Sequence, residues 1–344
     1  MKAVVMRRGE LVLDEVPAPV PGEGEVLLRT LACGICGSDL HALQRAARAE
    51  ADGAEQTDPV VGATGSDVVM GHEFCAEVVD FGPGTEGTLA PGTRVVSVPS
   101  GVGYSDERPG GYGEFMILPE ARLLRVPDHL ATEHAAMTEP LAVGEHAVAR
   151  ALIEAGDVPL VIGCGPVGLA VIAALRARRL SPIVAADFSP KRRELAAGIG
   201  ADVVVDPNEQ PAFESWREAA DSPVSADGLD ERSALVFECV GVPGMIQSII
   251  DDAPRNSRVV VAGVCMQDDV IRPLAAIRTQ INLQFVLGYT PEEFEATLDA
   301  LATERIDAGP LVTAHIGLDD VPDAFRTLTD PSEHAKIMIV ADRD

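Results

Sequence analysis

Two groups of side chains in the first half of the chain have the types that hold a metal ion. Cys33 and Cys36 form a C-x-x-C pair, and His72 stands beside Glu73. A structural zinc site needs four ligands, and no second C-x-x-C follows, so the cysteine pair alone does not make one. A catalytic zinc needs three protein ligands and an open position, and the candidates are Cys36, His41, His72, Glu73 and Glu139. A lone His or Glu is more often solvated or hydrogen-bonded than a ligand, so spacing alone leaves both interpretations open.

A glycine-rich turn indicates a dinucleotide site. Residues 163–168 read Gly-Cys-Gly-Pro-Val-Gly, follow a short apolar run and open a helical segment that extends to about residue 179. Gly163 permits the tight turn, Gly165 lets the backbone approach a pyrophosphate, and Gly168 lets the helix pack on the sheet. The alternative is a glycine-rich turn that binds no ligand.

An acid after the next apolar run bears on the choice of cofactor. The carboxylate of Asp187 is placed to accept the ribose hydroxyls of NAD and to repel the 2′-phosphate of NADP, although Arg192 or Arg193 could pair with that phosphate. Two further segments end predicted strands, where ligands of such sheets bind, but they could equally be ordinary turns. The predicted cofactor residues are Gly163, Gly165, Pro166, Val167, Gly168, Asp187, Arg192, Cys239, Val240, Val261 and Gly263.

The elements that must position these residues fall into two patterns. The first 150 residues contain short strands bounded by Gly and Pro, such as 25–30, 77–81 and 94–98, which predicts a β-rich domain. Within them, residues 42–66 predict a helical piece that leads into a mobile surface loop. Beyond residue 150, strands alternate with helices, which predicts a parallel sheet covered on both faces. The predicted strands of this part are 159–162, 183–186, 203–205, 235–239 and 259–262, with helices at 190–197 and 291–303 and a later strand at 336–340.

Length and composition exclude several classes of protein. A chain of 344 residues predicts two domains, and 47% apolar residues argue against disorder. With 27 basic and 54 acidic residues, the chain has a net charge of −27, which makes nucleic acids and anionic membranes poor partners. No apolar run approaches the roughly 20 residues that span a bilayer, and the first residues lack a signal-peptide pattern, so a cytoplasmic location is expected. Six cysteines are too few for a disulfide scaffold.

Several motifs in a fixed order carry a family resemblance. Residues 34–41 read Gly-Ile-Cys-Gly-Ser-Asp-Leu-His, and they are followed by Gly-His-Glu at 71–73, by Glu-Pro-Leu at 139–141 and by the turn at 163–168 with Asp187. Over essentially its whole length the chain resembles the zinc-dependent alcohol dehydrogenases of the medium-chain dehydrogenase/reductase superfamily. The Glu-Pro-Leu segment is most similar to the branch of sorbitol and threonine dehydrogenases.

The resemblance implies an architecture and a reaction. It implies an α/β protein with a GroES-like, β-rich catalytic domain (1–152 and 288–344) and a doubly wound Rossmann domain that binds NAD (153–287). The implied enzyme transfers a hydride from a secondary alcohol or polyol to NAD and gives a ketone. Its partners would be a small-molecule substrate and further copies of the chain, as a homodimer or homotetramer.

The resemblance also implies roles for individual residues. Zinc would be held by Cys36, His72 and Glu139, and Glu73 could enter its coordination sphere. Asp39 would orient the ligand His72, and Ser38 and His41 would form a proton relay. Cys33 matches no ligand and is expected to be structural.

Two departures from the family pattern limit the transfer of a substrate. Residues 99–113 lack the four cysteines that hold a structural zinc in many members, which predicts one catalytic zinc and no structural zinc. The stretch between Cys36 and His72 is longer than expected for this branch. The alternatives are a zinc-free reductase of an activated C=C bond or quinone, and a non-catalytic NAD-binding sensor. Intact Cys36, His72 and Glu139 argue against both.

Overall fold

The computed structural model describes residues 1–52, 57–58, 62–63, 67–99, 101–105, 107–223, 230–328 and 334–341. The chain divides into two compact units, Met1–Glu139 with Val312–Asp344, and Pro140–Leu311. The expected domain boundaries after residues 152 and 287 concern functional domains and stay predictions. Both units are described separately below.

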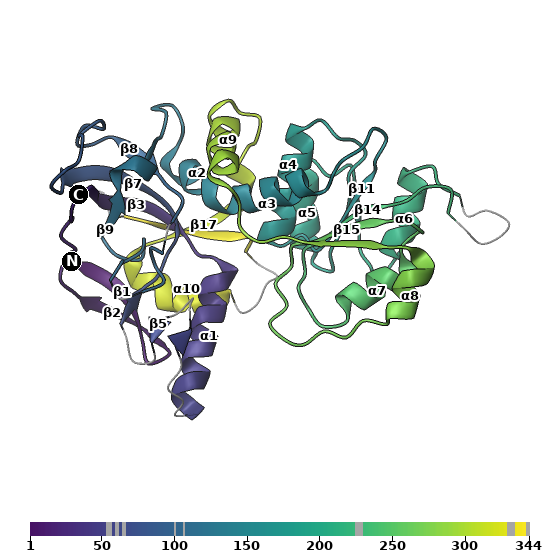
Figure 1. Cartoon of the computed structure of the whole chain (residues 1–344), viewed down its shortest axis with the longest axis horizontal. Coiled ribbons are helices and arrows are strands. Elements are labelled where there is room, and N and C mark those ends of the chain that lie inside the picture. The colour runs from purple at the N-terminus through teal and green to yellow at the C-terminus, as the bar shows by residue number, and fades with distance from the viewer. Residues whose placement is uncertain are drawn as a thin grey trace. The chain divides into compact units, whose positions relative to one another are not determined.

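The first unit is built on two sheets of mainly antiparallel strands (Figure 1). The smaller has the order β2-β1-β6, and the larger the order β10-β8-β7-β3-β18-β17, with β9 also paired to β3. The strands are β1 (Lys2–Arg7), β2 (Glu10–Glu15), β3 (Glu25–Gly34), β6 (Val68–Val69), β7 (Glu73–Phe81), β8 (Arg94–Val96), β9 (Phe115–Pro119), β10 (Leu124–Arg125), β17 (Val312–Ile316) and β18 (Lys336–Val340), and a further pair joins β4 (Thr57–Asp58) to β5 (Gly62–Ala63).

The register of the larger sheet brings distant parts of the sequence together at Gly34. This residue lies opposite Glu73 on β7 and opposite Met338 on β18. An ideal Cβ on Gly34 would lie 2.1 Å from an oxygen of Glu73, so a side chain at this position would displace Glu73. The sheet therefore places the His-Glu motif directly beside the loop that carries Cys36.

Three elements of this unit differ from the prediction in their bounds. β3 continues to Gly34 rather than ending near residue 30, and β7 begins at Glu73 rather than near residue 77. Residues on both faces of these extensions are buried, so the strands show no alternation of polar and apolar residues there. The helix expected from residue 42 begins at Gly37 and ends at Asp52, and most of the loop expected after it lies outside the described residues.

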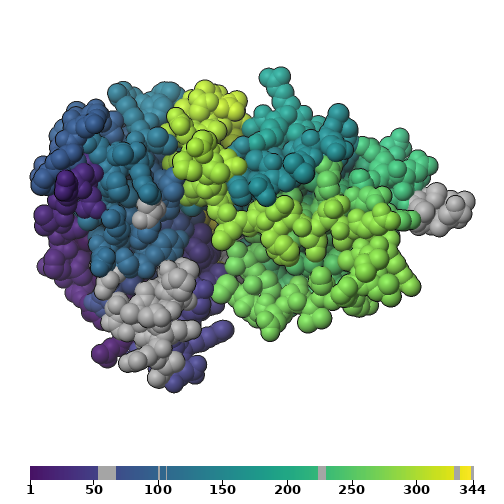
Figure 2. Space-filling model, in the orientation of Figure 1, coloured from purple at the N-terminus to yellow at the C-terminus, as the bar shows by residue number. Residues whose placement is uncertain are grey.

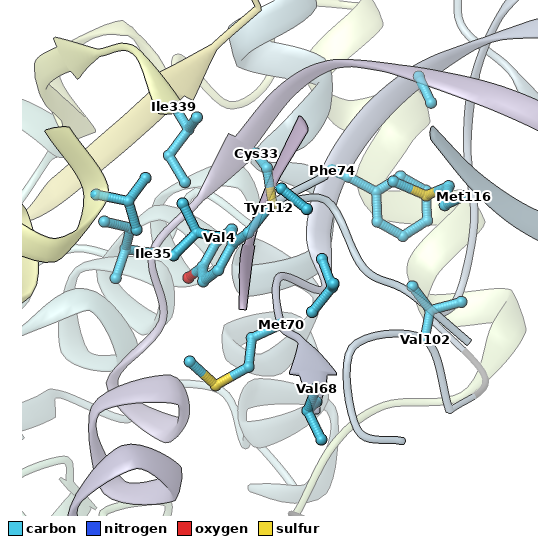
Figure 3. Close-up of a cluster of buried hydrophobic side chains, with 14 of the residues drawn as sticks. Val4, Cys33, Ile35, Val68, Met70, Phe74, Val102, Tyr112, Met116 and Ile339 are labelled. Atoms are coloured by element: carbon cyan, nitrogen blue, oxygen red, sulfur yellow. The ribbon is translucent and has the colours of Figure 1, made fainter. Parts of the chain in front are cut away.

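The core of the first unit is formed by apolar side chains from both sheets and from α10. Figure 3 shows part of it, with Val4, Cys33 and Met70 near Tyr112, and Phe74 beside Met116. Tyr112 is fully buried, and its ring meets that of Phe325 edge-on. The helices of this unit are α1 (Gly37–Asp52), α2 (Thr132–Ala136), α10 (Val321–Thr327) and the start of α3 (Thr138–Arg150).

The second unit contains a six-stranded parallel sheet with the order β13-β12-β11-β14-β15-β16 (Figure 1). The order reverses beside β11, which is the arrangement of a doubly wound dinucleotide-binding sheet. The predicted α/β class is confirmed. The strands are β11 (Pro159–Ile162), β12 (Val184–Ala186), β13 (Val203–Val205), β14 (Leu235–Glu238), β15 (Arg258–Val261) and β16 (Asn282–Phe285), and the helices are α4 (Pro166–Ala177), α5 (Pro190–Ile199), α6 (Ala212–Ala219), α7 (Met245–Asp252), α8 (Pro273–Thr279) and α9 (Pro291–Ala302).

No helix in the described part of the chain is long and apolar enough to cross a membrane.

Candidate active site

The loop before α1 is held by the side chain of Asp39. Its Oδ2 accepts a hydrogen bond from the backbone N–H of Cys36 at 3.0 Å, and the backbone N–H of Asp39 donates to the carbonyl of Cys36 at 3.2 Å. These reciprocal bonds fix Cys36 just before the helix, as a capping carboxylate does. Ser38 and His41 lie half-buried on the first turns of the same helix.

His72 is placed by a glycine that no other residue could replace without strain. Gly71 has a φ of +100°, and an ideal Cβ there would lie 2.6 Å from the ring of Tyr112. The next residue, His72, is only 4% exposed. Its Nδ1 lies 3.4 Å from Oδ1 of Asp39, and its Nε2 lies 3.5 Å from Oγ of Ser38.

Three of the predicted ligands lie together. Ligand atoms of Cys36, His72 and Glu73 are all within 4.8 Å of one another, and this is the one such group found among the described residues. Ligands of a tetrahedral zinc with bonds of about 2.0–2.3 Å are roughly 3.3–3.8 Å apart, so small side-chain movements would suffice. Nδ1 of His72 is buried and faces Oδ1 of Asp39 at 3.4 Å, too far for a well-formed hydrogen bond. A soft thiolate, an imidazole and a carboxylate are zinc donors, so these residues fit the metal.

Glu139 is not part of this three-residue group. It is the second residue of α3 and is half-buried. The pKa of Tyr104, whose ring stacks on His72 at 5.2 Å, is raised mainly by burial; the charges of Asp39 and Cys36 add to this, and that of Glu139 adds least. Glu139 therefore acts electrostatically on the surroundings of His72, and its place as a third ligand stays a prediction.

Glu73 has a partner that the sequence did not reveal. Nζ of Lys336, at the start of β18, lies 2.5 and 2.6 Å from the two carboxylate oxygens of Glu73 and donates to the carbonyl of Ile35 at 3.0 Å. Both side chains are at most 2% exposed. Burial lowers the pKa of Lys336, but the charges of Glu73, Cys36 and Glu139 and the hydrogen bond to Glu73 together outweigh it, so the pKa is raised. Because Lys336 occupies both oxygens, Glu73 is a poorer ligand here than Cys36 or His72.

Two tyrosines were also missed, and both come from the stretch 99–113. Tyr104 lies against His72, and the hydroxyl of Tyr112 donates to Oδ2 of Asp39 at 2.6 Å. Burial raises the pKa of Asp39, but the charge of His72 and the hydrogen bonds from Tyr112 and Cys36 outweigh it, so the pKa is lowered. Asp39 is thus a buried carboxylate that links both ligands to Tyr112.

Cys33 differs chemically from the residues of the ligand group. It is fully buried, and burial raises the pKa of its thiol well above the usual value. A thiol that stays protonated is a poor zinc ligand, which agrees with the structural role expected for Cys33.

The glycine-rich turn of the second unit has the geometry that its motif requires. Gly163 has a φ of +91°, and Gly165 is the N-cap of α4, with Pro166 as the first helical residue. An ideal Cβ on Gly168 would lie 1.8 Å from the carbonyl oxygen of Gly163, so the turn and the helix touch there. The N-terminus of α4 is free of a side-chain cap, which leaves its N–H groups for an anion.

Asp187 braces this turn as well as following β12. Its Oδ2 accepts from the N–H of Cys164 at 2.7 Å, and its Oδ1 accepts from the N–H of Ser189 at 2.8 Å. Arg193 is engaged with the carbonyl of Asp187 and with the carboxylate of Asp206. Arg192 also lies near the carboxylate of Asp187, with 3.9 Å between Nη1 and Oδ2, and its part in cofactor binding stays a prediction.

The ends of β14 and β15 line a cavity of about 240 Å³. Val261 and Gly263 belong to its lining, whereas Cys239 and Val240 do not. Glu238 closes the turn after β14, since its Oε1 accepts from the N–H groups of Val240 and Gly241 at 2.8 Å each. Glu238 was not predicted from the sequence, although an acid at the end of an apolar strand indicates a residue that could hold the following turn.

Comparison with known proteins decides the family. The sequence model of the "Alcohol dehydrogenase GroES-like domain" matches residues 22–128, and that of the "Zinc-binding dehydrogenase" domain matches residues 166–303. The (R,R)-butanediol dehydrogenase of Bacillus subtilis (strain 168) is 30% identical over 96% of this chain and 96% of its own length. The chain belongs to the zinc-dependent alcohol dehydrogenases.

Other members of the zinc-dependent alcohol dehydrogenases agree in extent and fold. The sorbitol dehydrogenase of Gallus gallus is 30% identical over 99% of this chain and 96% of its own length. The crystal structure of 2R,3R-butanediol dehydrogenase from Bacillus subtilis superposes with a TM-score of 0.82 at 28% identity, over 99% of each chain. As a zinc-dependent alcohol dehydrogenase, the protein is an oxidoreductase that acts on CH–OH groups with zinc and a nicotinamide dinucleotide. The predicted family, the reaction class, and the use of zinc and a nicotinamide dinucleotide are confirmed, whereas one zinc per chain stays a prediction.

Proposed function

We propose that the enzyme oxidises a secondary hydroxyl group of a diol or polyol to a ketone, with NAD as the acceptor and one catalytic zinc per chain. The observation that carries the proposal is the approach of the thiol of Cys36 to the buried imidazole of His72, in a chain whose second unit holds the turn at 163–168. Similarity to butanediol and sorbitol dehydrogenases supports the choice of a diol or polyol.

Each residue near the metal ligands has a task in this reaction. Cys36, His72 and Glu139 would hold zinc, and Lys336 would neutralise Glu73. When bound, zinc acts as a Lewis acid that lowers the pKa of the alcohol hydroxyl, and NAD accepts the hydride from the carbinol carbon. Oγ of Ser38, beside His72, accepts the hydroxyl proton and donates its own toward His41. Ser38 and His41 are three positions apart on α1 and share one face of that helix.

The second unit would bind and discriminate the cofactor. The N–H groups at the start of α4 would bind the pyrophosphate, Asp187 would accept the ribose hydroxyls, and Gly165 would allow close approach. Asp187 is only 9% exposed and is already fixed by two backbone N–H groups, so it cannot turn away from a 2′-phosphate. This arrangement favours NAD over NADP, because the phosphate would meet a held negative charge.

A panel of substrates, with matched cysteine variants, tests the proposal. NAD reduction would be measured with 2,3-butanediol, sorbitol, threonine and 2-propanol, before and after incubation with a zinc chelator. Cys36→Ala should lose zinc and activity, whereas Cys33→Ala, three residues away, should keep both. Turnover that survives chelation and Cys36→Ala would instead favour the zinc-free reductase. NAD binding without turnover on any substrate would favour the sensor.

We also propose that the chain forms a homodimer or homotetramer in the cytoplasm. β16 is an edge strand of its described sheet, and exposed apolar side chains gather on and near it and on α8. Figure 2 shows α8 in green at the surface of the second unit. Leu274, Ile277, Phe285 and Leu287 are each at least 60% exposed, and a cluster of this kind marks contact surfaces. All six cysteines are free, as in a reducing compartment. Light scattering after size-exclusion chromatography would give the oligomeric state.

A further inference from the structure

Asp39 has three partners around its carboxylate, and they come from three different parts of the chain. On Oδ2 it accepts the hydroxyl of Tyr112 at 2.6 Å and the N–H of Cys36 at 3.0 Å, and on Oδ1 it faces Nδ1 of His72 at 3.4 Å. Asp39 is 1% exposed and Tyr112 is fully buried, so water does not compete for these contacts. A carboxylate held at both ends has one orientation, and the two donors on Oδ2 determine it.

Tyr112 is a rigid donor. Its backbone N–H donates to the carbonyl of Met70 at 2.9 Å, just after β6, and its own carbonyl accepts from the N–H of Val4 on β1 at 2.8 Å, so its backbone is held at two points. Its ring packs against Phe325 and against the backbone of Gly71, which precedes His72. Figure 3 shows the ring enclosed by Val4, Ile35 and Met70, which leaves it no other position. A phenol fixed in this way orients its acceptor rather than following it.

The short hydrogen bond from Tyr112 matters because, without it, Oδ2 of Asp39 would keep only the hydrogen bond from the N–H of Cys36. Hydrogen bonds to charged acceptors are shorter and about twice as strong as neutral ones, and 2.6 Å is in that range. Burial first, and then the charge of Asp39, raises the pKa of Tyr112 well above its usual value, so the phenol keeps its proton. Without the phenol, the carboxylate could rotate about its bond and Oδ1 would leave Nδ1 of His72.

We propose that Tyr112 is a positioning residue that fixes Asp39 against His72 and so determines how firmly the chain holds zinc. The inference rests on the zinc site proposed above. A carboxylate that accepts from a ligand imidazole sets the direction of that ligand, and loss of such partners costs about 10–100-fold in metal affinity. Tyr112 acts one contact farther out, so an effect near the lower end, about tenfold, is expected.

The test compares zinc release from the wild-type enzyme with release from Tyr112→Phe. Zinc leaving the loaded protein is followed with a colorimetric chelator in excess, and cobalt(II) replaces zinc in a parallel sample to record the absorption bands of the metal. Tyr112→Phe keeps the ring and its contact with Phe325. It should release zinc about tenfold faster and shift the cobalt bands, because the direction of His72 changes.

A matched variant separates this effect from general loosening of the fold. Thr30→Val removes another buried hydroxyl of the same unit, which donates to the carbonyl of Gly113 at 2.7 Å, next to Tyr112. It should release zinc at the wild-type rate even if its thermal midpoint falls as far as that of Tyr112→Phe. In an Asp39→Asn background, Tyr112→Phe should add little, since a residue that acts through Asp39 has no further effect once Asp39 is changed.

The outcomes distinguish a failure of the proposed zinc site from a failure of the role proposed for Tyr112. A wild-type enzyme that retains no zinc would overturn the proposed function and this inference together. A wild-type enzyme that retains zinc, with Tyr112→Phe releasing it at the same rate or more slowly, would overturn the inference alone. Equal acceleration by Thr30→Val, or a full effect of Tyr112→Phe in the Asp39→Asn background, would show that Tyr112 does not act through Asp39.

Discussion

Replacing Lys336 by Met should strongly destabilise the first unit. The change removes a cation that binds both oxygens of Glu73 and the carbonyl of Ile35, in a place that is at most 2% exposed. It leaves a buried carboxylate without its counter-charge. Breaking a buried pair from one side costs about 3–5 kcal/mol, a large part of the roughly 5–15 kcal/mol that stabilises a domain. The corresponding fall in thermal midpoint is roughly 10 °C.

Urea unfolding followed by circular dichroism would measure this loss in chelator, so that metal binding does not contribute. Lys191→Met is the matched control, because Lys191 forms an exposed pair with Glu194 and should cost less than about 1 kcal/mol. In the double variant Glu73→Gln/Lys336→Met both charges are gone, and most of the stability should return. This variant also keeps the test informative if Lys336→Met alone does not fold.

The pH dependence of the same difference has a definite sign. The pKa of Lys336 is raised above its usual value of 10.5, so the wild-type advantage over Lys336→Met should be constant at lower pH and shrink above about pH 10.5. The reasoning would be refuted if Lys336→Met unfolds within about 1 kcal/mol of wild type. It would also be refuted if the double variant is no more stable than the single one.

Three further predictions concern the cofactor turn and the metal. Gly168→Ala should weaken NAD binding, measured by calorimetry, at least about tenfold, because its Cβ would lie 1.8 Å from a backbone oxygen. Gly198→Ala on α5, with open space around it, should leave NAD binding unchanged. Equal effects of the two substitutions would contradict this explanation. Asp187→Ser should reduce the preference for NAD over NADP, measured as a ratio of kcat/KM values, by about tenfold or more, and an unchanged ratio would remove Asp187 from cofactor choice. Adding zinc to wild-type protein from which the metal has been removed should raise its thermal midpoint. At a free zinc concentration a thousandfold above Kd, the added stabilisation would be about 4 kcal/mol. Cys36→Ala should show no rise, and a rise in that variant would place the metal elsewhere.

The fold of the second unit could be predicted from the sequence because its signals are local. Strands 159–162 and 203–205 are apolar runs next to glycine or helix-starting residues, and the parallel sheet follows from their alternation with helices. In the first unit the same reasoning misplaced the ends of β3 and β7, where residues on both faces are buried and the alternating pattern disappears.

The site was predictable only as far as its motifs extend along the chain. Cys36, Asp39 and His72 lie in the short motifs at 34–41 and 71–73, whose residue types indicate a metal site. Lys336 is 263 positions away from Glu73, and a lysine at the start of an apolar strand carries no sign of a buried partner. Tyr112 was unpredictable for the same reason as Lys336, since its contact with Asp39 spans 73 residues and depends on the turn at Gly71. Such partners follow from tertiary packing, which spacing along the sequence does not encode.

The insertion of β18 between β3 and β17 has a consequence for how the protein is made. The ribosome delivers Cys36, His72 and Glu73 early, and then the whole contiguous unit 140–311, before it delivers Lys336. During this interval the second unit has all of its strands, whereas β3 has an open edge and Glu73 has no counter-charge. Until β18 is added, the nascent first unit is thus a half-closed sheet, and an unpaired strand edge of this kind is prone to pair with other chains.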